Sequence, residues 1–407
     1  MDVGTLPFPS LLCSPHDSFP LHSNRPHHPE RHLKPRTTFF LYLLASGACA
    51  PPPASQAPAP DASTRHAIES VSRFITDTMR VLGAPGAAIC VMRDGRIVWS
   101  AGFGMADLEQ QVPVSTTTRF RIGSVSKALT SAALGRLVET GQLDLDAPVQ
   151  RYVPGFPVKR YPVTVRQVAG HLAGIRHYLE GEFENQKHYG SQTEGLAMFA
   201  RDSLLFEPGT NFEYSSFGYN LLGAVVEGAT GRDFRAYVNE QIFRRAGMTR
   251  TSAEHPDSII PGRGRYYTRA DSTGPIVNAI YADNTYKWAS GGFVSTPEDL
   301  ARFGDALLQG KLVKPETRDL LWTSMHTTDG EATEYGIGWT VEADSAGRRR
   351  VRHSGGSVGG TAHLIIYPEQ RTIVALVVNS DYTFVRAIKR YAEPFVEGED
   401  RAADERR

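Results

Sequence analysis

The sequence predicts an α+β fold in which one antiparallel sheet is built from both ends of the chain and is flanked by terminal helices. Apolar and β-branched runs typical of strands occur at residues 87–104 and again at 335–379. Between them, residues 120–310 show mostly helical spacing and long loops rich in Gly, Pro and Tyr. Because each element must bury its apolar face against another, we expect this large insertion to form a helical subdomain packed beside the sheet.

The N-terminal part of this fold begins with a helix predicted over residues 65–82. Its apolar residues recur at helical spacing: Ile68, Val71, Phe74, Ile75 and Met79. Two strands are predicted next, at 87–93 and 96–104. Asp94-Gly95 stands between them and is a strong hairpin signal.

The C-terminal part of the chain returns to strands. They are predicted at residues 335–342, 349–354, 361–367 and 372–379, with a turn at 368–370. A last helix is expected from about residue 382 to 396. The sequence order therefore favours one sheet that joins the first two strands to the last four.

Three regions are expected along the chain: a leader and linker over 1–63, a folded domain over 64–398 and a charged tail over 399–407. Residues 36–45 combine a basic flank with a short apolar core, which is typical of an export signal and too short to span a bilayer. Small residues precede Cys49, as in a bacterial lipoprotein cleavage site. We therefore expect an exported bacterial protein, either periplasmic or tethered to the membrane as a lipoprotein.

Composition and motifs give no support to several function classes. The 44 Lys and Arg residues balance 44 Asp and Glu, so nothing indicates a nucleic-acid partner. Three cysteines are too few for a disulfide framework, and neither H-E-x-x-H nor a Cys-His cluster indicates a metal. The glycine-rich residues 355–360 lack the following helix that would hold a phosphate. We therefore expect no metal and no cofactor.

Ser124-Val-Ser-Lys127 is the stretch that most clearly indicates chemistry. Gly123 precedes it and a helical pattern follows, so Ser124 and Lys127 should share one face of a helix. A serine hydroxyl becomes a good nucleophile when a neighbouring base takes its proton, and a buried lysine can be that base. In a chain of this composition, roughly half a match to the pattern S-x-x-K is expected by chance. The motif therefore indicates catalysis only if other site residues are found elsewhere in the chain.

Several blocks of sequence, in order, supply those partners. Ser124-Val-Ser-Lys127, the segment Leu143–Pro154 and the loop His171–Tyr178 resemble the serine β-lactamase-like superfamily of class C β-lactamases, penicillin-binding peptidases and family VIII esterases. Within it, the chain is most similar to the mitochondrial serine β-lactamase-like members and their bacterial relatives. The resemblance covers about residues 65–395 and implies the β-lactamase/transpeptidase-like fold.

The same resemblance implies the remaining site residues. Tyr214 matches the tyrosine of the second motif, which relays protons, and Ser216 stands where the family has asparagine. His353-Ser-Gly-Gly356 takes the place of Lys-Thr-Gly, with His353 at the substrate-binding lysine. The backbone N–H groups of Ser124 and Gly356 are expected to form the oxyanion hole.

The resemblance implies a serine hydrolase that forms an acyl-enzyme on an ester, amide or peptide, with a small molecule or a peptide as substrate. A true β-lactamase is less favoured because Ser216 and His353 replace the family's residues. A non-catalytic, self-assembling scaffold on the same fold is the alternative, and a homo-oligomer is compatible with either. His171 and His177 are expected to be structural.

Overall fold

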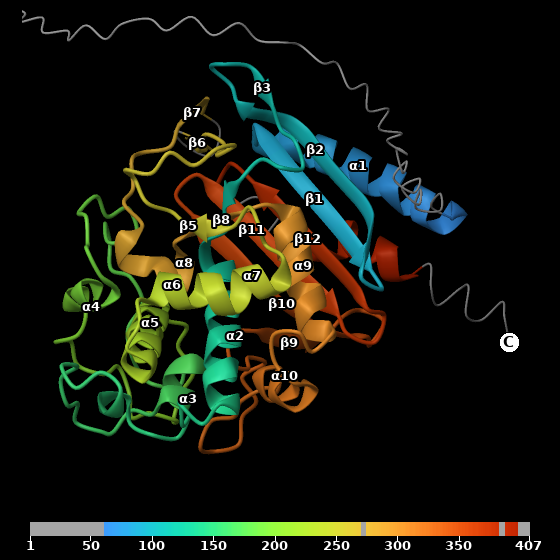
Figure 1. Cartoon of the computed structure of the whole chain (residues 1–407). Helices are drawn as coiled ribbons and strands as arrows, with labels where there is room; N and C mark the ends of the chain where they lie inside the picture. The colour runs from blue at the N-terminus through green and yellow to red at the C-terminus, as the bar shows by residue number, and fades with distance from the viewer. Residues whose placement is uncertain (1–60, 270–273, 382–386, 398–407) are drawn as a thin grey trace, which may run out of the picture. The chain divides into compact units, whose positions relative to one another are not determined.

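A seven-stranded antiparallel sheet organises the described part of the chain, in the order β3-β2-β1-β12-β11-β10-β9. The computed structural model describes residues 61–269, 274–381 and 387–397. In it, β1 (Gly86–Arg93) pairs with β12 (Thr372–Val378), so that strands from the two ends of the chain, blue and red in Figure 1, lie side by side. The predicted sheet is confirmed. Residues 1–60 of the predicted leader and linker and the predicted tail at 399–407 fall outside the described residues, whereas residues 61–63 already cap and begin the first helix.

The other strands of this sheet lie close to the predicted positions. They are β2 (Arg96–Asp107), β3 (Val112–Pro113), β9 (Thr340–Ala343), β10 (Arg349–Ser357) and β11 (Gly360–Tyr367). One prediction is displaced, because regular pairing of β9 begins at Thr340 rather than near residue 335. Just before it the backbone makes a tight turn, with Gly338 at φ 81° and the Gly336 N–H donating to the Trp339 carbonyl.

The central strands β1, β11 and β12 are buried on both faces, and alternation along each of them divides the apolar residues between two layers. In β1, Ile89 and Val91 face a layer formed with α1 (Ala62–Leu82) and α11 (Ile388–Tyr391). The residue between them, Cys90, faces the larger core under the helical subdomain. This explains why the strand reads as an almost continuous apolar run.

The terminal helices differ in how well the sequence predicted them. Asp61 caps α1 by accepting the Thr64 N–H, and Gly83 ends it in the left-handed conformation with φ 68°. The predicted last helix is shorter than expected in the described residues. It comprises α11, a turn at 392–393 and a further helical stretch at 394–397.

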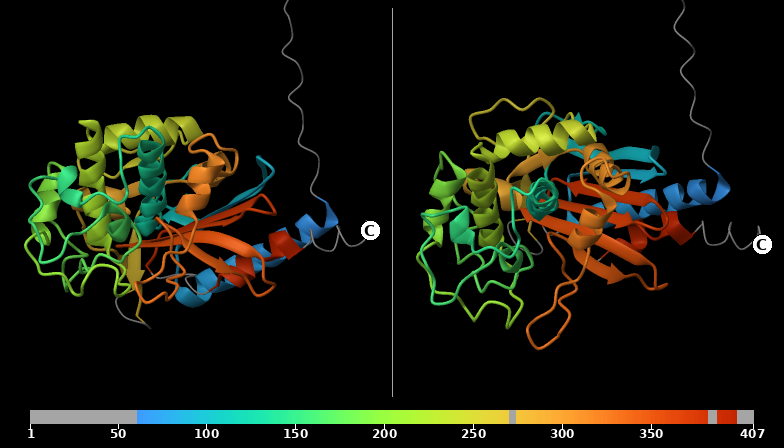
Figure 2. Two further views of the ribbon diagram at one scale, coloured as in Figure 1. Left: turned by 90° about the horizontal axis from the view of Figure 1, so that it is seen from below. Right: turned by 60° about the horizontal axis from the view of Figure 1, so that its bottom comes forward.

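The insertion forms a helical subdomain against the second face of the sheet (Figure 2). Its α-helices are α2 (Ser126–Glu139), α3 (Val165–Ala169), α4 (Gln192–Gly195), α5 (Ser216–Thr230), α6 (Phe234–Val238), α7 (Arg244–Ala246), α8 (Trp288–Gly291), α9 (Pro297–Leu308) and α10 (Pro315–Leu321). Short 3-10 turns are η1 (Gly123–Val125), η2 (Val149–Arg151), η3 (Leu196–Met198) and η5 (Thr285–Lys287), and η4 (Asn239–Phe243) is a π-helix.

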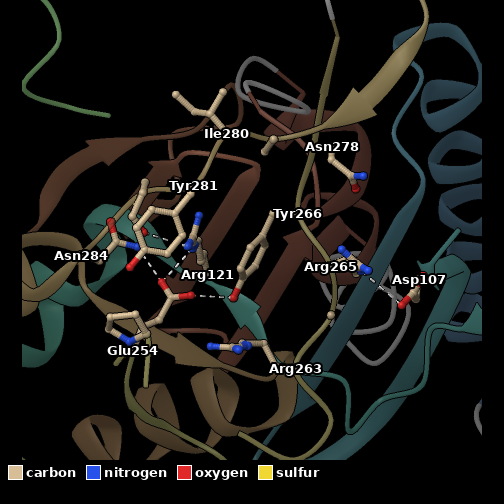
Figure 3. Close-up of a pocket in the computed structure, with 14 residues that line it drawn as sticks. Asp107, Arg121, Glu254, Arg263, Arg265, Tyr266, Asn278, Ile280, Tyr281 and Asn284 are labelled. Atoms are coloured by element: carbon tan, nitrogen blue, oxygen red, sulfur yellow. Dashed lines mark hydrogen bonds and ion pairs between the residues drawn. The ribbon is translucent and has the colours of Figure 1, made fainter. Parts of the chain in front are cut away.

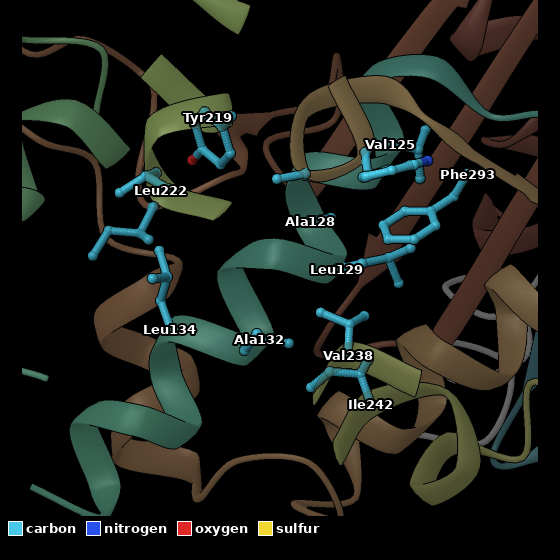
Figure 4. Close-up of a cluster of buried hydrophobic side chains, with 14 of the residues drawn as sticks. Val125, Ala128, Leu129, Ala132, Leu134, Tyr219, Leu222, Val238, Ile242 and Phe293 are labelled. Carbon is cyan, nitrogen blue, oxygen red and sulfur yellow. The ribbon is translucent and has the colours of Figure 1, made fainter. Parts of the chain in front are cut away.

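Helix α2 is the centre of this subdomain. Most of its residues are buried, polar ones included, and Leu129, Val238 and Phe293 are among the side chains that meet around it (Figure 4). A helix buried all round is held by its neighbours rather than by one amphipathic face. The position of the residues at its N-terminal end is therefore fixed by the whole core.

Two small sheets were not predicted. One joins β4 (Phe120–Arg121), β8 (Phe293–Ser295) and β5 (Ser252–Ala253), and the other joins β6 (Tyr267–Arg269) to β7 (Ile276–Asn278). Strands of two or three residues are too short to show a period of two in the sequence. The first sheet is important for the site because β4 leads directly into the turn that carries Ser124.

The layered core gives a stability prediction. We expect Ile89→Ala, in the fully buried β1, to lower the free energy of unfolding by about 2–5 kcal/mol, because it removes apolar contacts and leaves a cavity. Ile97→Ala on β2, where the side chain is 37% exposed, should cost only about 0.5 kcal/mol. Urea denaturation of both variants measures the difference, and equal losses would contradict the layered arrangement.

Candidate active site

Ser124 lies in the short turn η1 between β4 and α2. Gly123, just before it, has φ 47°, and a Cβ there would collide with the Gly356 carbonyl of β10. A Cβ on Gly355 would likewise collide with the Ile122 carbonyl, and would come within 2.9 Å of the Ser124 nitrogen. Glycines on both sides therefore allow β10 to lie directly against the backbone of the serine.

Lys127 lies one turn along α2 with its side chain fully buried. Its Nζ is 2.9 Å from the Ser124 Oγ, 3.0 Å from the Ser216 Oγ and 2.9 Å from the Ser290 carbonyl oxygen. Burial lowers the pKa of Lys127 well below its usual value, and the positive charge of Lys287 lowers it further. The neutral amine can donate to the carbonyl and still accept the hydroxyl proton of Ser124.

Tyr214 stands beside this pair. The Lys127 Nζ lies 5.0 Å from the centre of its ring. Burial raises the pKa of Tyr214, although its interaction with the Ser124 hydroxyl opposes the rise. Tyr214 is therefore a neutral phenol at physiological pH, suited to donate a proton rather than to act as a phenolate base.

His171 and His177 hold the segment that carries Tyr214. The His171 Nδ1 accepts the Ser215 N–H at 3.1 Å, and the His177 Nδ1 accepts the Ser216 N–H at 3.2 Å. Burial lowers the pKa of His177 to about 4, with Lys127 adding to the effect, so the ring stays neutral and can accept. These contacts support the structural role expected for both histidines.

His353 is buried and engaged by other protein groups. Its Nε2 is 2.9 Å from the Tyr335 hydroxyl, and its Nδ1 is 2.7 Å from the Ser354 carbonyl oxygen, so Nδ1 carries the proton. Burial lowers the pKa of His353 to about 3. The residue offers no positive charge at neutral pH, and its predicted contact with substrate stays a prediction.

A cleft of about 510 Å³ opens at Ser124. Of the sequence-predicted residues, Ser124, Ser216 and Gly356 line it, while Lys127 lies buried behind them. The sequence indicated that loops at about 175–210 and 255–290 line the cleft, but not which of their side chains do. The structure adds these lining groups: His177, Tyr178, Leu179, Glu180, Gly181, Phe183, Glu184, Lys287, Ser290 and Gly291.

A second cavity, of about 520 Å³, lies around Arg121 and Glu254 (Figure 3). Glu254 accepts hydrogen bonds from Arg121 at 2.7 Å, Asn284 at 2.6 Å and Tyr266 at 3.0 Å. Although this cavity is slightly larger, it contains no nucleophile with an adjacent base. Its buried ion pair fixes Arg121 at the end of β4, three residues before Ser124, which makes it a support for the Ser124 site.

No group of three or more His, Cys, Asp or Glu side chains in the described residues could hold a metal ion. The serine hydroxyl and the lysine amine lie within hydrogen-bond distance of each other at the cleft. A fold of this kind with a serine and a lysine at the start of a buried helix defines a class of serine hydrolases.

Comparisons with known proteins identify the family. The Beta-lactamase family model matches residues 71–395. The human protein "Serine beta-lactamase-like protein LACTB, mitochondrial" is 33% identical in an alignment that covers 77% of this chain and 75% of that protein. The chain belongs to the Beta-lactamase family.

Solved structures agree with this assignment. The octameric penicillin-binding protein homologue from Pyrococcus abyssi matches with a TM-score of 0.70 and 28% identity, covering 81% of this chain and 77% of the other. A D-stereospecific amidohydrolase from Streptomyces sp. matches with a TM-score of 0.65 and 25% identity, covering 80% and 96%. The predicted β-lactamase/transpeptidase-like fold is confirmed.

The predicted localisation in a bacterial periplasm or membrane is wrong. The relatives at 33% identity are mitochondrial proteins of Homo sapiens, Mus musculus and Bos taurus. The basic flank at residues 36–45 misled the prediction, because basic residues also characterise leaders for import into mitochondria. In the part of the chain that the structure describes, no helix has the length and apolarity needed to cross a membrane.

The contact between β10 and the Ser124 turn can be tested by Gly355→Ala. Its Cβ would collide with the Ile122 carbonyl, so the strand or the turn must move and the geometry around Ser124 must change. We expect labelling of Ser124 by a fluorophosphonate to slow by about 100-fold, since small displacements of reacting groups carry costs of that size. Gly155→Ala, where a Cβ meets open space, is the control and should label normally.

His353 gives a prediction about acid stability. The ring is neutral when folded, with a pKa of about 3, but takes up a proton near pH 6.5 when unfolded. Stability is therefore complete above pH 6.5 and falls as the pH drops from 6.5 toward 3. In denaturant titrations, His353→Gln should show a smaller loss of unfolding free energy between pH 8 and pH 5 than the parent. The exposed His66→Gln should leave that loss unchanged.

Proposed function

We propose that the protein is a serine hydrolase that forms an acyl-enzyme on an ester, amide or peptide substrate. The observation that carries this proposal is the 2.9 Å contact between the Lys127 Nζ and the Ser124 Oγ. In the described part of the chain no carboxylate lies within 4 Å of that amine, and its side chain is fully buried. A lysine in this setting is neutral and can act as the base for the serine.

In the proposed reaction the Ser124 Oγ attacks the substrate carbonyl carbon, and its proton passes to the Lys127 Nζ. The carbonyl oxygen becomes an oxyanion held by the N–H groups of Ser124 and Gly356. Tyr214 donates its proton to the leaving group and recovers one from Lys127. Water then attacks the Ser124 ester and gives a proton to Lys127. The lysine returns this proton to the Ser124 Oγ as the bond between the acyl group and the serine breaks and the acid is released.

Two positions at which this chain departs from the family's usual residues, Ser216 and His353, indicate the substrate class. Ser216 contributes a hydroxyl, already 3.0 Å from Lys127, rather than an amide that could hold an acyl side chain. His353 is neutral and hydrogen-bonded to the Tyr335 hydroxyl, so it offers no positive charge to bind the carboxylate of a β-lactam. Similarity to a D-stereospecific amidohydrolase supports an amide or peptide substrate over a β-lactam.

A homo-oligomer stays a prediction, supported by the octameric state of the Pyrococcus abyssi homologue. The alternative of a non-catalytic scaffold is weakened because Ser124, Lys127 and Tyr214 are all present and in contact. The predicted membrane tether falls on residues 36–50, which lie outside the described residues.

Covalent labelling tests the proposal. A fluorophosphonate should label the folded protein at Ser124, and Lys127→Ala should slow labelling by about 10²–10⁴-fold because the base is lost. Lys311→Ala, an exposed lysine remote from the cleft, is the matched control and should label at the parent rate. A folded protein that is not labelled would favour the scaffold.

The lysine base also predicts a pH profile. Because the pKa of Lys127 is well below its usual value, the amine loses its proton at a lower pH than an exposed lysine does, and acylation should reach its maximum at that lower pH. The rate should fall only at lower pH, where Lys127 becomes protonated. Rates of p-nitrophenyl acetate hydrolysis between pH 5 and 9 measure this, and a rate that rises steadily up to pH 10 would rule out a depressed lysine as the base.

A further inference from the structure

We propose that Lys287 binds a carboxylate group of the substrate within the Ser124 cleft. The inference rests on the proposed function only in taking this cleft as the substrate site. Lys287 lines the cleft together with Ser124 and Gly356, yet it belongs to a different segment of the chain, at the junction of η5 and α8.

The side chain of Lys287 is only 2% exposed, and its surroundings are mostly aromatic. The Nζ donates one long hydrogen bond, 3.3 Å, to the Phe183 carbonyl oxygen. It lies 4.4 Å from the ring centre of Phe183, 5.2 Å from that of Tyr286 and 5.7 Å from that of Tyr178. An ammonium group has three protons to donate, so this site leaves donor capacity unused.

Two of the carboxylates around Lys287 are engaged elsewhere. Glu254 already accepts from three donors, as Figure 3 shows. Glu182 forms an ion pair with Arg176 at 2.7 Å. Glu184 is exposed at the mouth of the cleft, and among the described residues no ion pair within 4 Å joins it to Lys287. A buried cation without a counter-ion is costly, and an anionic ligand would remove that cost.

The charge of Lys287 is available at neutral pH. Burial, followed by repulsion from Arg121, lowers the pKa of Lys287 to about 7, while Glu254 and Glu184 act in the opposite direction. The other titratable groups that face it are Lys127, His177, Tyr178 and Tyr286. A bound carboxylate stabilises the protonated amine, so carboxylate binding should weaken as the pH rises through 7.

Calorimetry on the Ser124→Ala protein tests the inference without turnover. We compare hexanoate with its uncharged analogue hexanamide at pH 6.0 and 8.5. At pH 6.0 hexanoate should bind about tenfold more tightly than hexanamide, as expected for one charge-assisted hydrogen bond. At pH 8.5 this preference should largely disappear.

Substitutions of Lys287 test whether this residue causes the preference for hexanoate over hexanamide. Adding Lys287→Met should remove the preference for hexanoate, whereas Lys287→Arg should keep it at both pH values, because arginine stays charged. Lys187→Met, an exposed lysine on the neighbouring loop, is the control and should change nothing. An unchanged preference in Lys287→Met, or a pH-dependent one in Lys287→Arg, would overturn the inference. If Lys287→Met does not fold, the arginine variant alone decides.

The two proposals fail separately. Binding of hexanoate through Lys287 in a protein that a fluorophosphonate does not label would overturn the hydrolase and leave the anion site standing. Labelling of Ser124 without any preference for hexanoate over hexanamide would support the hydrolase and overturn the proposed carboxylate site at Lys287.

Discussion

The burial of Lys127, with no carboxylate paired to it among the residues that the structure describes, is the constraint on which the rest of the site depends. Burial favours the neutral amine of a lysine in this position, and the amine needs polar partners in fixed places. Those partners come from three segments, the η1 turn with Ser124, the start of α5 with Ser216 and the end of α8 with Ser290. The packing of helices around α2 therefore sets the chemistry of the lysine.

The large sheet also contributes to the position of Ser124, through its strand β10. This strand lies against the Ser124 turn only because Gly123 and Gly355 leave no side chain between the two backbones. On the other side of the turn, Arg121 is held by Glu254 and by the Val358 carbonyl, which follows β10. A buried ion pair and two glycines thus fix the serine backbone relative to the strand, which is what backbone oxyanion donors require.

The sequence predicted the parts of this structure that have local signatures. The strands β1 and β12 are apolar runs, and Ser124 with Lys127 forms a spaced pair, so both were identified from the sequence. The two- and three-residue strands have no readable period, and Lys287 has no motif. Its burial and lack of a counter-ion arise from contacts with residues 178–183, roughly a hundred positions away in the sequence, so only the folded structure reveals them. The neutrality of His353 likewise depends on Tyr335 and on burial.

The charge of Lys287 affects the protonation of Lys127, the other buried lysine at the cleft. A protonated Lys287 disfavours a second positive charge nearby and so helps to keep Lys127 in its basic form. Glu254 would cancel this effect if it paired with Lys287, but Arg121 and Asn284 already engage its carboxylate. The ion pair in the second cavity therefore also influences reactivity, because it leaves Lys287 free to act on both Lys127 and an incoming anion. With His353 neutral, the cation that faces the substrate lies on the α8 side of the cleft rather than on β10.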